Sequence, residues 1–371
     1  MSRAWLWAAG AIAIGLRLAL FIATSYHPIV ADSGTLVSPK IVSGTDLLFY
    51  QERQRDIFSA PAKKSLADYL PFSCASQGML AGPLLPALLQ LFRYENGNSW
   101  PLALFFLFAG SGMTLAWLRW LQRAGVSPVG LTLFAFLPGP IYYTLCVGTE
   151  LPFCLLFTVF FISYFKKSWD LAAVAAWSVM LLLLLLTRPN ALAILLFVIL
   201  DSTRRYYSNL SLKRMSVLGG LLAAALLFGG LFFSYFAIVY KATATKAFFG
   251  VPDNQYLEGL YPMFPIWLDR FLSVISLIGA KILYLFGLRP SYSHVSMPYV
   301  LFRVASGLFL LPGFIYLFAK GEARHKALVF LFVLPILMVG SQERYSLPIQ
   351  PLLFFYAAKA FGLVGPKEVE A

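Results

Sequence analysis

The sequence predicts an all-α, polytopic membrane protein, and three observations lead to this class. Hydrophobic residues make up 60% of the 371 residues and charged residues only 12%, whereas a soluble domain carries about 25% charged residues because its surface must be solvated. The mean hydropathy is +0.76. The apolar runs are long, and they lack the strand-like alternation of a membrane barrel. We therefore expect a bundle of transmembrane helices.

Ten apolar runs are predicted to span the bilayer. The first, 4–25, is long enough to cross and lacks a small-x-small cleavage site, which favours a transmembrane helix over a cleaved signal peptide. Some of the others are shorter than about 20 residues, so we expect them to be kinked, tilted or partly embedded. The further runs are 100–118, 127–145, 150–165, 170–187, 190–203, 215–239, 299–319, 326–341 and 346–364.

The net charge of +13 comes from small basic clusters between these runs. Short cytoplasmic loops carry such clusters under the positive-inside rule, beside anionic lipid headgroups. We therefore expect membrane lipids, and no nucleic acid, among the partners. The clusters include Arg119 with Arg123, Lys166 with Lys167, Arg204 with Arg205, and Lys320 with Arg324 and Lys326.

The run 271–288 decides the number of spans. It is apolar, but Lys281 interrupts it and Arg289-Pro290 closes it. If it lies on or re-enters the outer face, every basic cluster falls in the cytoplasm. If it crosses as an eleventh span, the basic loop 320–326 moves outside or another span is lost. We favour ten spans in one membrane-embedded domain, 1–371, with both termini in the cytoplasm and no soluble C-terminal domain.

This topology leaves two large outer segments. The first, 26–97, has balanced charges and contains a proline-punctuated apolar piece at 79–92. That piece is predicted to lie in the membrane interface as an amphipathic helix. The second, 240–298, carries many aromatic residues and few charges, which suits an interfacial cover over a lipid-facing cavity.

Asp46 is the first candidate for chemistry. It follows Ser43-Gly44-Thr45 and precedes an apolar run, so it could simply cap a helix. On the outer face the same carboxylate could accept a proton from an acceptor hydroxyl as a general base. Tyr50 lies one helical turn on, on the same face, where it could shape the site.

Glu150 and Arg188 are predicted at the outer ends of helices. Glu150 begins a helix, where the macrodipole favours an anion; the alternative is a functional carboxylate that faces the same cavity as Asp46. Arg188, in a Thr-Arg-Pro-Asn break, costs about 2.5–3.5 kcal/mol near hydrocarbon unless it snorkels or meets an anion. A lipid phosphate is one such anion, since guanidinium binds phosphate bidentately.

A second charged group, Glu343-Arg344-Tyr345, follows the penultimate run. Either Glu343 and Arg344 neutralise each other, or Arg344 forms the second arm of a phosphate clamp with Arg188.

In their order along the chain, these motifs resemble the GT-C superfamily of membrane glycosyltransferases, in particular its protein-mannosyltransferase and aminoarabinose-transferase-like branch. The resemblance makes Asp46 the counterpart of the family's first-loop catalytic aspartate. The typical Pro-Pro-Leu tract occurs only as Gly82-Pro83-Leu84, and the large soluble C-terminal domain of some members is missing.

The resemblance implies transfer of a sugar, with inversion, from a polyprenyl-phosphate donor to a glycan, lipid or protein acceptor on the outer face of a bacterial inner membrane. A phosphate leaving group needs cations rather than a strong acid. Asp46 would serve as the base, with no cofactor or metal. The expected substrate-binding residues are Tyr50, Glu150, Arg188, Glu343, Arg344 and Tyr345.

Three alternatives stay open. One is a transporter or flippase of a lipid-linked glycan, although transporters tend to place ionisable groups near the bilayer midplane. Another is a GT-C enzyme of the O-antigen ligase or polymerase type, which puts its large outer loop late in the chain. The third is a non-catalytic scaffold.

Overall fold

The computed structural model describes residues 3–26, 29–30, 36–37, 84–92, 100–142, 148–165, 171–188, 190–206, 247–248, 251–288, 297–339 and 343–365. These residues are mostly helical, as predicted. Two strand pairs of two residues each are antiparallel: β1 (Ile29–Val30) with β2 (Leu36–Val37), and β3 (Ala247–Phe248) with β4 (Val251–Pro252). The helices are α1 (Arg3–Tyr26), α3 (Leu84–Leu91), α4 (Trp100–Arg123), α5 (Pro128–Ala135), α6 (Pro138–Tyr142), α7 (Glu150–Tyr164), α8 (Leu171–Thr187), α9 (Ala191–Tyr206), α11 (Asp253–Glu258), α12 (Ile266–Leu285), α13 (Met297–Lys320), α14 (Ala323–Val339), α15 (Glu343–Ser346) and α16 (Gln350–Ala360).

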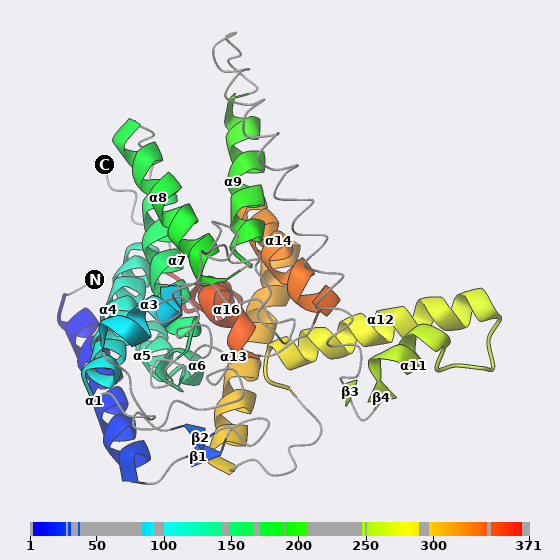
Figure 1. Ribbon diagram of the computed structural model, residues 1–371, viewed down its shortest axis with the longest axis horizontal. Helices are drawn as coiled ribbons and strands as arrows, with labels where there is room; N and C mark the ends of the chain where they lie inside the picture. The colour runs from blue at the N-terminus through cyan, green and yellow to red at the C-terminus, as the bar shows by residue number, and fades with distance from the viewer. Residues whose placement is uncertain are drawn as a thin grey trace, which may run out of the picture.

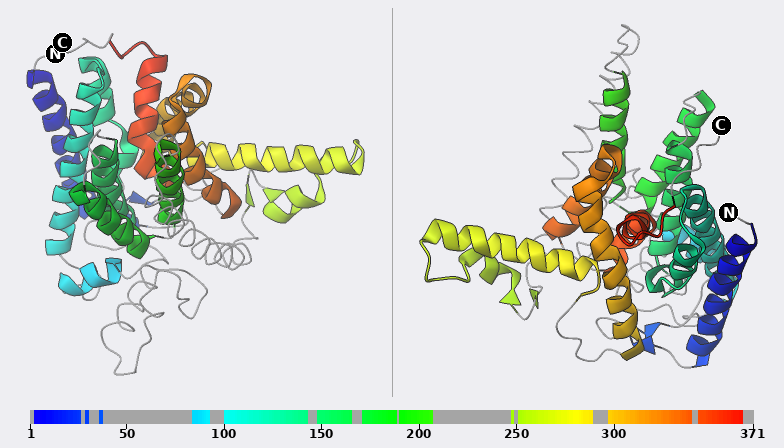
Figure 2. Two further views of the ribbon diagram at one scale, coloured as in Figure 1. Left: turned by 90° about the horizontal axis from the view of Figure 1, so that it is seen from above. Right: turned by 180° about the vertical axis from the view of Figure 1, so that it is seen from behind.

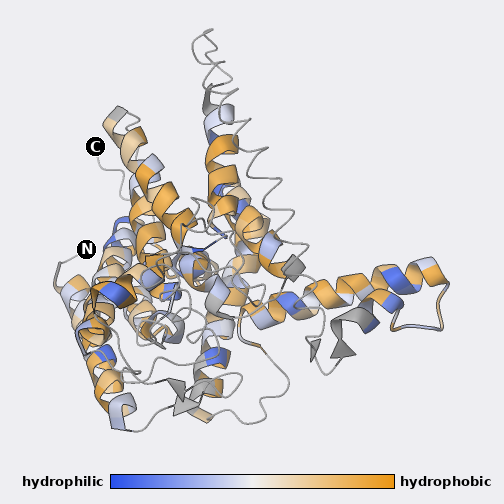
Figure 3. Cartoon of the chain, in the orientation of Figure 1, coloured by the Kyte–Doolittle hydropathy of each residue, from blue (hydrophilic) through white to orange (hydrophobic). Residues whose placement is uncertain are grey.

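Three of the described helices are long and apolar enough to cross a membrane: Ala4–Tyr26, Trp100–Arg123 and Arg303–Lys320. Three shorter apolar helices lie at Glu150–Tyr164, Ala172–Thr187 and Ala191–Thr203. Hydrophobic residues dominate α1, α4, α8 and α9 along their lengths (Figure 3). The predicted span 215–239 lies outside the described residues.

The predicted run 127–145 is two helices rather than one. α5 ends at Ala135 and α6 begins at Pro138, so this run, which is shorter than 20 residues, is interrupted. Proline has no backbone N–H and disfavours the helical conformation in the residue before it, and Pro138 and Pro140 both fall in this stretch. The run 346–364 is also interrupted, because a 3₁₀ helix, Leu347–Ile349, precedes α16.

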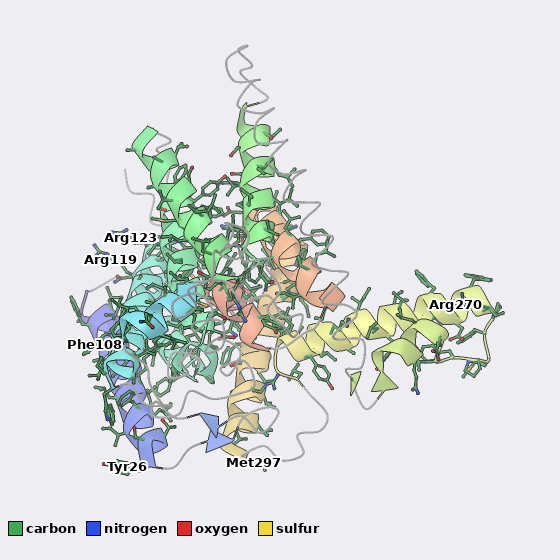
Figure 4. The ribbon with its side chains drawn as sticks, in the orientation of Figure 1. Tyr26, Phe108, Arg119, Arg123, Arg270 and Met297 are labelled. Atoms are coloured by element: carbon green, nitrogen blue, oxygen red, sulfur yellow. The ribbon has the colours of Figure 1, made fainter. Side chains whose placement is uncertain are left out.

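The helix ends define two opposite sides of the bundle. α1 and α4 are antiparallel neighbours, since Phe21 near the end of α1 contacts Trp100 at the start of α4. Figure 4 places Arg119 and Arg123 toward one end and Tyr26 and Met297 at the other. We call the side of Arg119, Arg123, Lys320 and Arg324 the basic end, and the side of Tyr26 and Met297 the opposite end.

The turn after α4 meets the segment after α16, where Val126 pairs with Val364 and the N–H of Gly365 donates to the carbonyl of Gly125. This contact joins the end of α4 to the end of α16.

A buried ion pair fixes three more helices at the basic end. Arg324 at the start of α14 donates through Nε and Nη2 to Oδ1 and Oδ2 of Asp201 on α9, at 2.8 Å each. The hydroxyl of Tyr164, the last residue of α7, donates to the same carboxylate at 3.0 Å. The guanidinium also lies 4.5 Å from the ring centroid of Phe165. These bonds hold the end of α7, the end of α9 and the start of α14 at one level.

α12 extends away from the bundle, crosswise to α13, with α11 beside it (Figures 1 and 2). Its projecting part exposes Trp267, Phe271 and Ile275, whereas Lys281 is buried near the bundle, where α12 packs against α14 and α15. The crosswise direction favours the interpretation of the run 271–288 as a helix along the interface rather than an eleventh span.

α13 and α16 form the most extensive helix pair, and Gly313 lets their backbones approach. A Cβ atom at Gly313 would collide with the carbonyl oxygen of Leu353 and the amide nitrogen of Ala357. In lipid the hydrophobic effect does not drive helices together, so their association depends on close van der Waals packing. Small residues such as glycine allow this close approach of the two backbones.

Gly313→Ala is therefore expected to destabilise the protein by about 1–3 kcal/mol, because the obstructing atoms belong to the backbone and cannot rotate away. The matched control is Gly112→Ala on α4, where an added Cβ would meet nothing within 4 Å. That change should stabilise the helix by up to about 1 kcal/mol. Thermal unfolding midpoints in detergent measure both, and equal shifts would contradict the packing argument.

Candidate functional site

Glu150 and Arg188 form an ion pair between α7 and the end of α8. Nη2 of Arg188 donates to Oε1 of Glu150 at 3.1 Å, and the side chains are only 15% and 10% exposed, respectively. A charge-assisted bond in such a sheltered place is stronger than one at a surface, where water screens the charges. The two residues are close in space although 38 positions separate them in the chain.

Tyr345 joins this pair from α15. The guanidinium carbon of Arg188 lies 5.2 Å from the centroid of the Tyr345 ring, within the range of a cation–π contact. We call Glu150, Arg188 and Tyr345 the Arg188 cluster. Three of the seven residues that the sequence predicts for the site therefore come together from three separate segments.

Local sequence explains how each charged member is presented. Glu150 is the first residue of α7, where exposed N–H groups favour a carboxylate. Gly148 leaves room for it, because a Cβ there would collide with Oε2 of Glu150. α8 ends at Thr187, directly before Arg188, since a residue that precedes proline is disfavoured in helical conformation.

The cluster lies at the opposite end from the basic clusters. α7 begins at Glu150 and ends at Tyr164, and Tyr164 is held at the basic end by Asp201. A helix of 15 residues is about 22 Å long at 1.5 Å per residue, so most of a bilayer's hydrocarbon thickness separates the two ends.

The remaining predicted site residues are not tested by the structure. Asp46 and Tyr50 lie outside the described residues. The backbone of Glu343 and Arg344 belongs to α15, next to Tyr345, but their side chains are outside the described part. The clamp of Arg188 with Arg344 and the neutralisation of Arg344 by Glu343 both stay predictions.

Arg17, a charged residue inside the apolar run 4–25, was not among the predicted site residues. It is completely buried and donates to the carbonyl of Ala13 at 3.0 Å, to Oγ1 of Thr114 at 2.5 Å and to the carbonyl of Pro140 at 3.1 Å. Arg17 thus ties α1 to α4 and to the broken α5–α6 segment. A charge within an apolar run was the available signal, because such residues are costly in lipid and serve bundle interiors.

A cavity of about 10 Å³ adjoins these partners of Arg17. Its polar lining includes Thr114, Thr158 and Pro140, and Cys154 lies beside them. This volume has room for one water molecule, which these oxygens could bind. It is far too small for a sugar.

The described residues bring no three His, Cys, Asp or Glu side chains together as a metal ion would require. No protein-family model, curated protein or solved structure matches this chain. A functional argument therefore rests on the motifs of the sequence and on the geometry of the Arg188 cluster.

Proposed function

We propose that this protein is a membrane glycosyltransferase that moves a sugar from a polyprenyl-phosphate donor to an acceptor hydroxyl. The observation that carries the proposal is the convergence of Glu150, Arg188 and Tyr345 at the end of the bundle opposite the basic clusters. Under the positive-inside rule the basic end faces the cytoplasm. The Arg188 cluster then faces outward, where a lipid-linked donor of this kind presents its sugar.

Arg188 supplies the electrostatic part of the chemistry. The leaving group is a lipid phosphate, whose negative charge grows as its bond to the sugar breaks, and a positioned guanidinium stabilises that charge. The Tyr345 ring supports the guanidinium plane and Glu150 holds one edge of it. Arg344, one residue before Tyr345, is the proposed second cation.

Asp46 is the proposed base. The acceptor oxygen attacks the anomeric carbon, the bond from that carbon to the phosphate oxygen breaks with its electron pair, and the acceptor proton passes to the Asp46 carboxylate. The proton and the electrons balance without a redox partner. Inversion at the anomeric carbon follows from this single displacement.

The rest of the architecture is proposed with it. The chain crosses a bacterial inner membrane ten times, with both termini in the cytoplasm. The segments 26–97 and 240–298 cover the outer face, and α12 lies along the interface. The acceptor is a glycan, a lipid or a protein.

A transporter or flippase of a lipid-linked glycan is the second candidate. The broken helix α5–α6 and the buried Arg17 favour it, because transporters use interrupted helices and buried charges in the bundle. The two functions differ in the step that fails when the protein is lost.

A deletion strain tests the proposal. Loss of a glycosyltransferase should leave polyprenyl-phosphate sugar in the outer leaflet and remove one sugar from an envelope glycan. Lipid extraction, with periodate or a membrane-impermeant lectin reporting the leaflet, measures both effects. Accumulation confined to the inner leaflet would instead identify a flippase, and no accumulation at all would count against both candidates.

Gly148→Ala is expected to lower transfer by up to about 100-fold per folded molecule, together with a lower thermal midpoint because the sheltered ion pair is weakened. The new methyl group takes the position of the Glu150 carboxylate and pushes it from Arg188, while both charges remain. Misplacement of a positioning group by about 1 Å can cost this much. Gly15→Ala on α1, where an added Cβ meets nothing within 4 Å, is the control for transfer rate and thermal midpoint. Equal activity of the two variants would show that the position of the Glu150 carboxylate does not affect transfer.

A further inference from the structure

Two lysines at the basic end lie over one aromatic surface. Nζ of Lys320 is 5.8 Å from the ring centroid of Tyr316 on α13. Nζ of Lys359 is 4.6 Å from the centroid of Phe355 and 5.4 Å from that of Tyr356, both on α16. The Tyr316 and Tyr356 centroids are 6.5 Å apart, so the two ammonium groups lie over adjoining rings.

The charges around these lysines leave the site positive. Among the residues that the structure describes, neither lysine has a carboxylate within salt-bridge distance. The Asp201 carboxylate is bonded to Arg324, and Glu322, whose carboxylate lies 3.7 Å from His325, contributes one negative charge beside the two lysines. His325 precedes the apolar run that begins at residue 326, and its burial lowers its pKa from 6.5 to about 4. It is therefore neutral at pH 7 and adds no charge.

The position of the lysines matches the headgroup level of a membrane. Lys320 ends the apolar stretch Arg303–Lys320, which is long enough to cross. The backbone N–H of Glu322 donates to the Tyr356 hydroxyl at 3.1 Å, so the end of α16 lies at the same level.

We propose that Lys320 and Lys359 bind the phosphate of an anionic membrane lipid, phosphatidylglycerol or cardiolipin, at the basic end. Ammonium groups that rest on aromatic rings keep their N–H bonds directed outward, and basic pockets between transmembrane helices on the cytoplasmic side are suited to such headgroups. Arg324 at the same end also lies over an aromatic ring, but it is bonded to Asp201, whereas the two lysines have no such carboxylate among the described residues. The proposal does not depend on glycosyl transfer.

Native mass spectrometry of the full-length protein, with phosphatidylglycerol titrated into the detergent micelle, tests it. Each lysine is expected to contribute roughly 5-fold to affinity, so Lys320→Gln with Lys359→Gln should weaken binding about 25-fold. The control is Arg119→Gln with Arg123→Gln, which removes the same charge from exposed residues of α4 at the same end. The control should bind like the wild type.

Further measurements keep the outcome decisive if the glutamine variant folds poorly. Lys320→Arg with Lys359→Arg should retain the lipid, because arginine keeps the charge and also lies over aromatic rings. Phosphatidylcholine, whose phosphate is neutralised by choline, should bind at least 10-fold more weakly, and inorganic phosphate should not displace the lipid. Equal losses in the lysine and arginine pairs, no preference for phosphatidylglycerol, or displacement by inorganic phosphate would overturn the proposed site.

Discussion

Arg188→Lys is expected to lower sugar transfer by about 100- to 1,000-fold, the loss typical when one positioned donor to a developing oxyanion is removed. Lysine keeps the positive charge, but it has no planar fork and cannot present two parallel N–H bonds to a phosphate. It also loses the cation–π contact of the guanidinium with Tyr345, whose ring centroid lies 5.2 Å from the guanidinium carbon. Transfer from a purified polyprenyl-phosphate sugar, measured per folded molecule, gives the effect.

Arg324→Lys is a close control for this change. Arg324 is also paired with a carboxylate and stacked on an aromatic ring, but it lies at the basic end. Its substitution should lower the thermal midpoint and leave the transfer rate of the folded fraction unchanged. If Arg188→Lys behaves in the same way, the Glu150–Arg188 pair is a structural bond and the leaving phosphate needs another partner.

The two members of the pair can be separated by a double-mutant cycle. Glu150→Gln keeps a hydrogen-bond acceptor for Arg188 at 3.1 Å but removes the opposing charge. If Glu150 acts by orienting Arg188, its substitution should cost little once Arg188 is lysine, because the group that it orients is gone. Independent, additive losses would mean that Glu150 meets the substrate in its own right.

Much of the fold could be predicted from local rules. Pro189 predicts the end of a helix at Thr187, and α8 ends there. The interruption of the run 127–145 agrees with its prolines, since Pro138 and Pro140 are disfavoured inside a continuous helix. The direction of α12 could not be predicted, since an apolar run is the same sequence whether it crosses a bilayer or lies along its surface.

The residues of the Arg188 cluster could be predicted from the sequence, but the ion pair between Glu150 and Arg188 could not. The structure shows Arg188 bonded to Glu150, a pair that was not predicted, while the expected clamp of Arg188 with Arg344 stays a prediction. Both carboxylate and guanidinium were expected at helix ends on one side, but sequence spacing gives no measure of how the helices rotate about their axes. Arg17 was missed because its three acceptors, on α1, α4 and α6, become neighbours only in the fold.

Asp46→Asn is expected to cause the largest loss, about 100- to 10,000-fold in transfer rate, the range for removal of a general base. Asparagine keeps the size and caps a helix about as well as aspartate, so the variant should insert and fold normally. Asp56→Asn, in the same segment, is the matched control. Near-normal turnover of Asp46→Asn would make Asp46 a cap and move the search for the base to Glu52, Asp56 or Glu150.

Of these three, Glu150 is the least suited to replace Asp46, because its carboxylate is already bonded to Arg188. Combining Asp46→Asn with Arg188→Lys tests whether the two residues serve one chemical step. Residues that act as a unit give grossly non-additive losses, so the double variant should lose far less than the product of the single losses. A fully multiplicative loss would show that Asp46 and Arg188 lower the barrier independently of each other, and would count against their acting as one coupled unit.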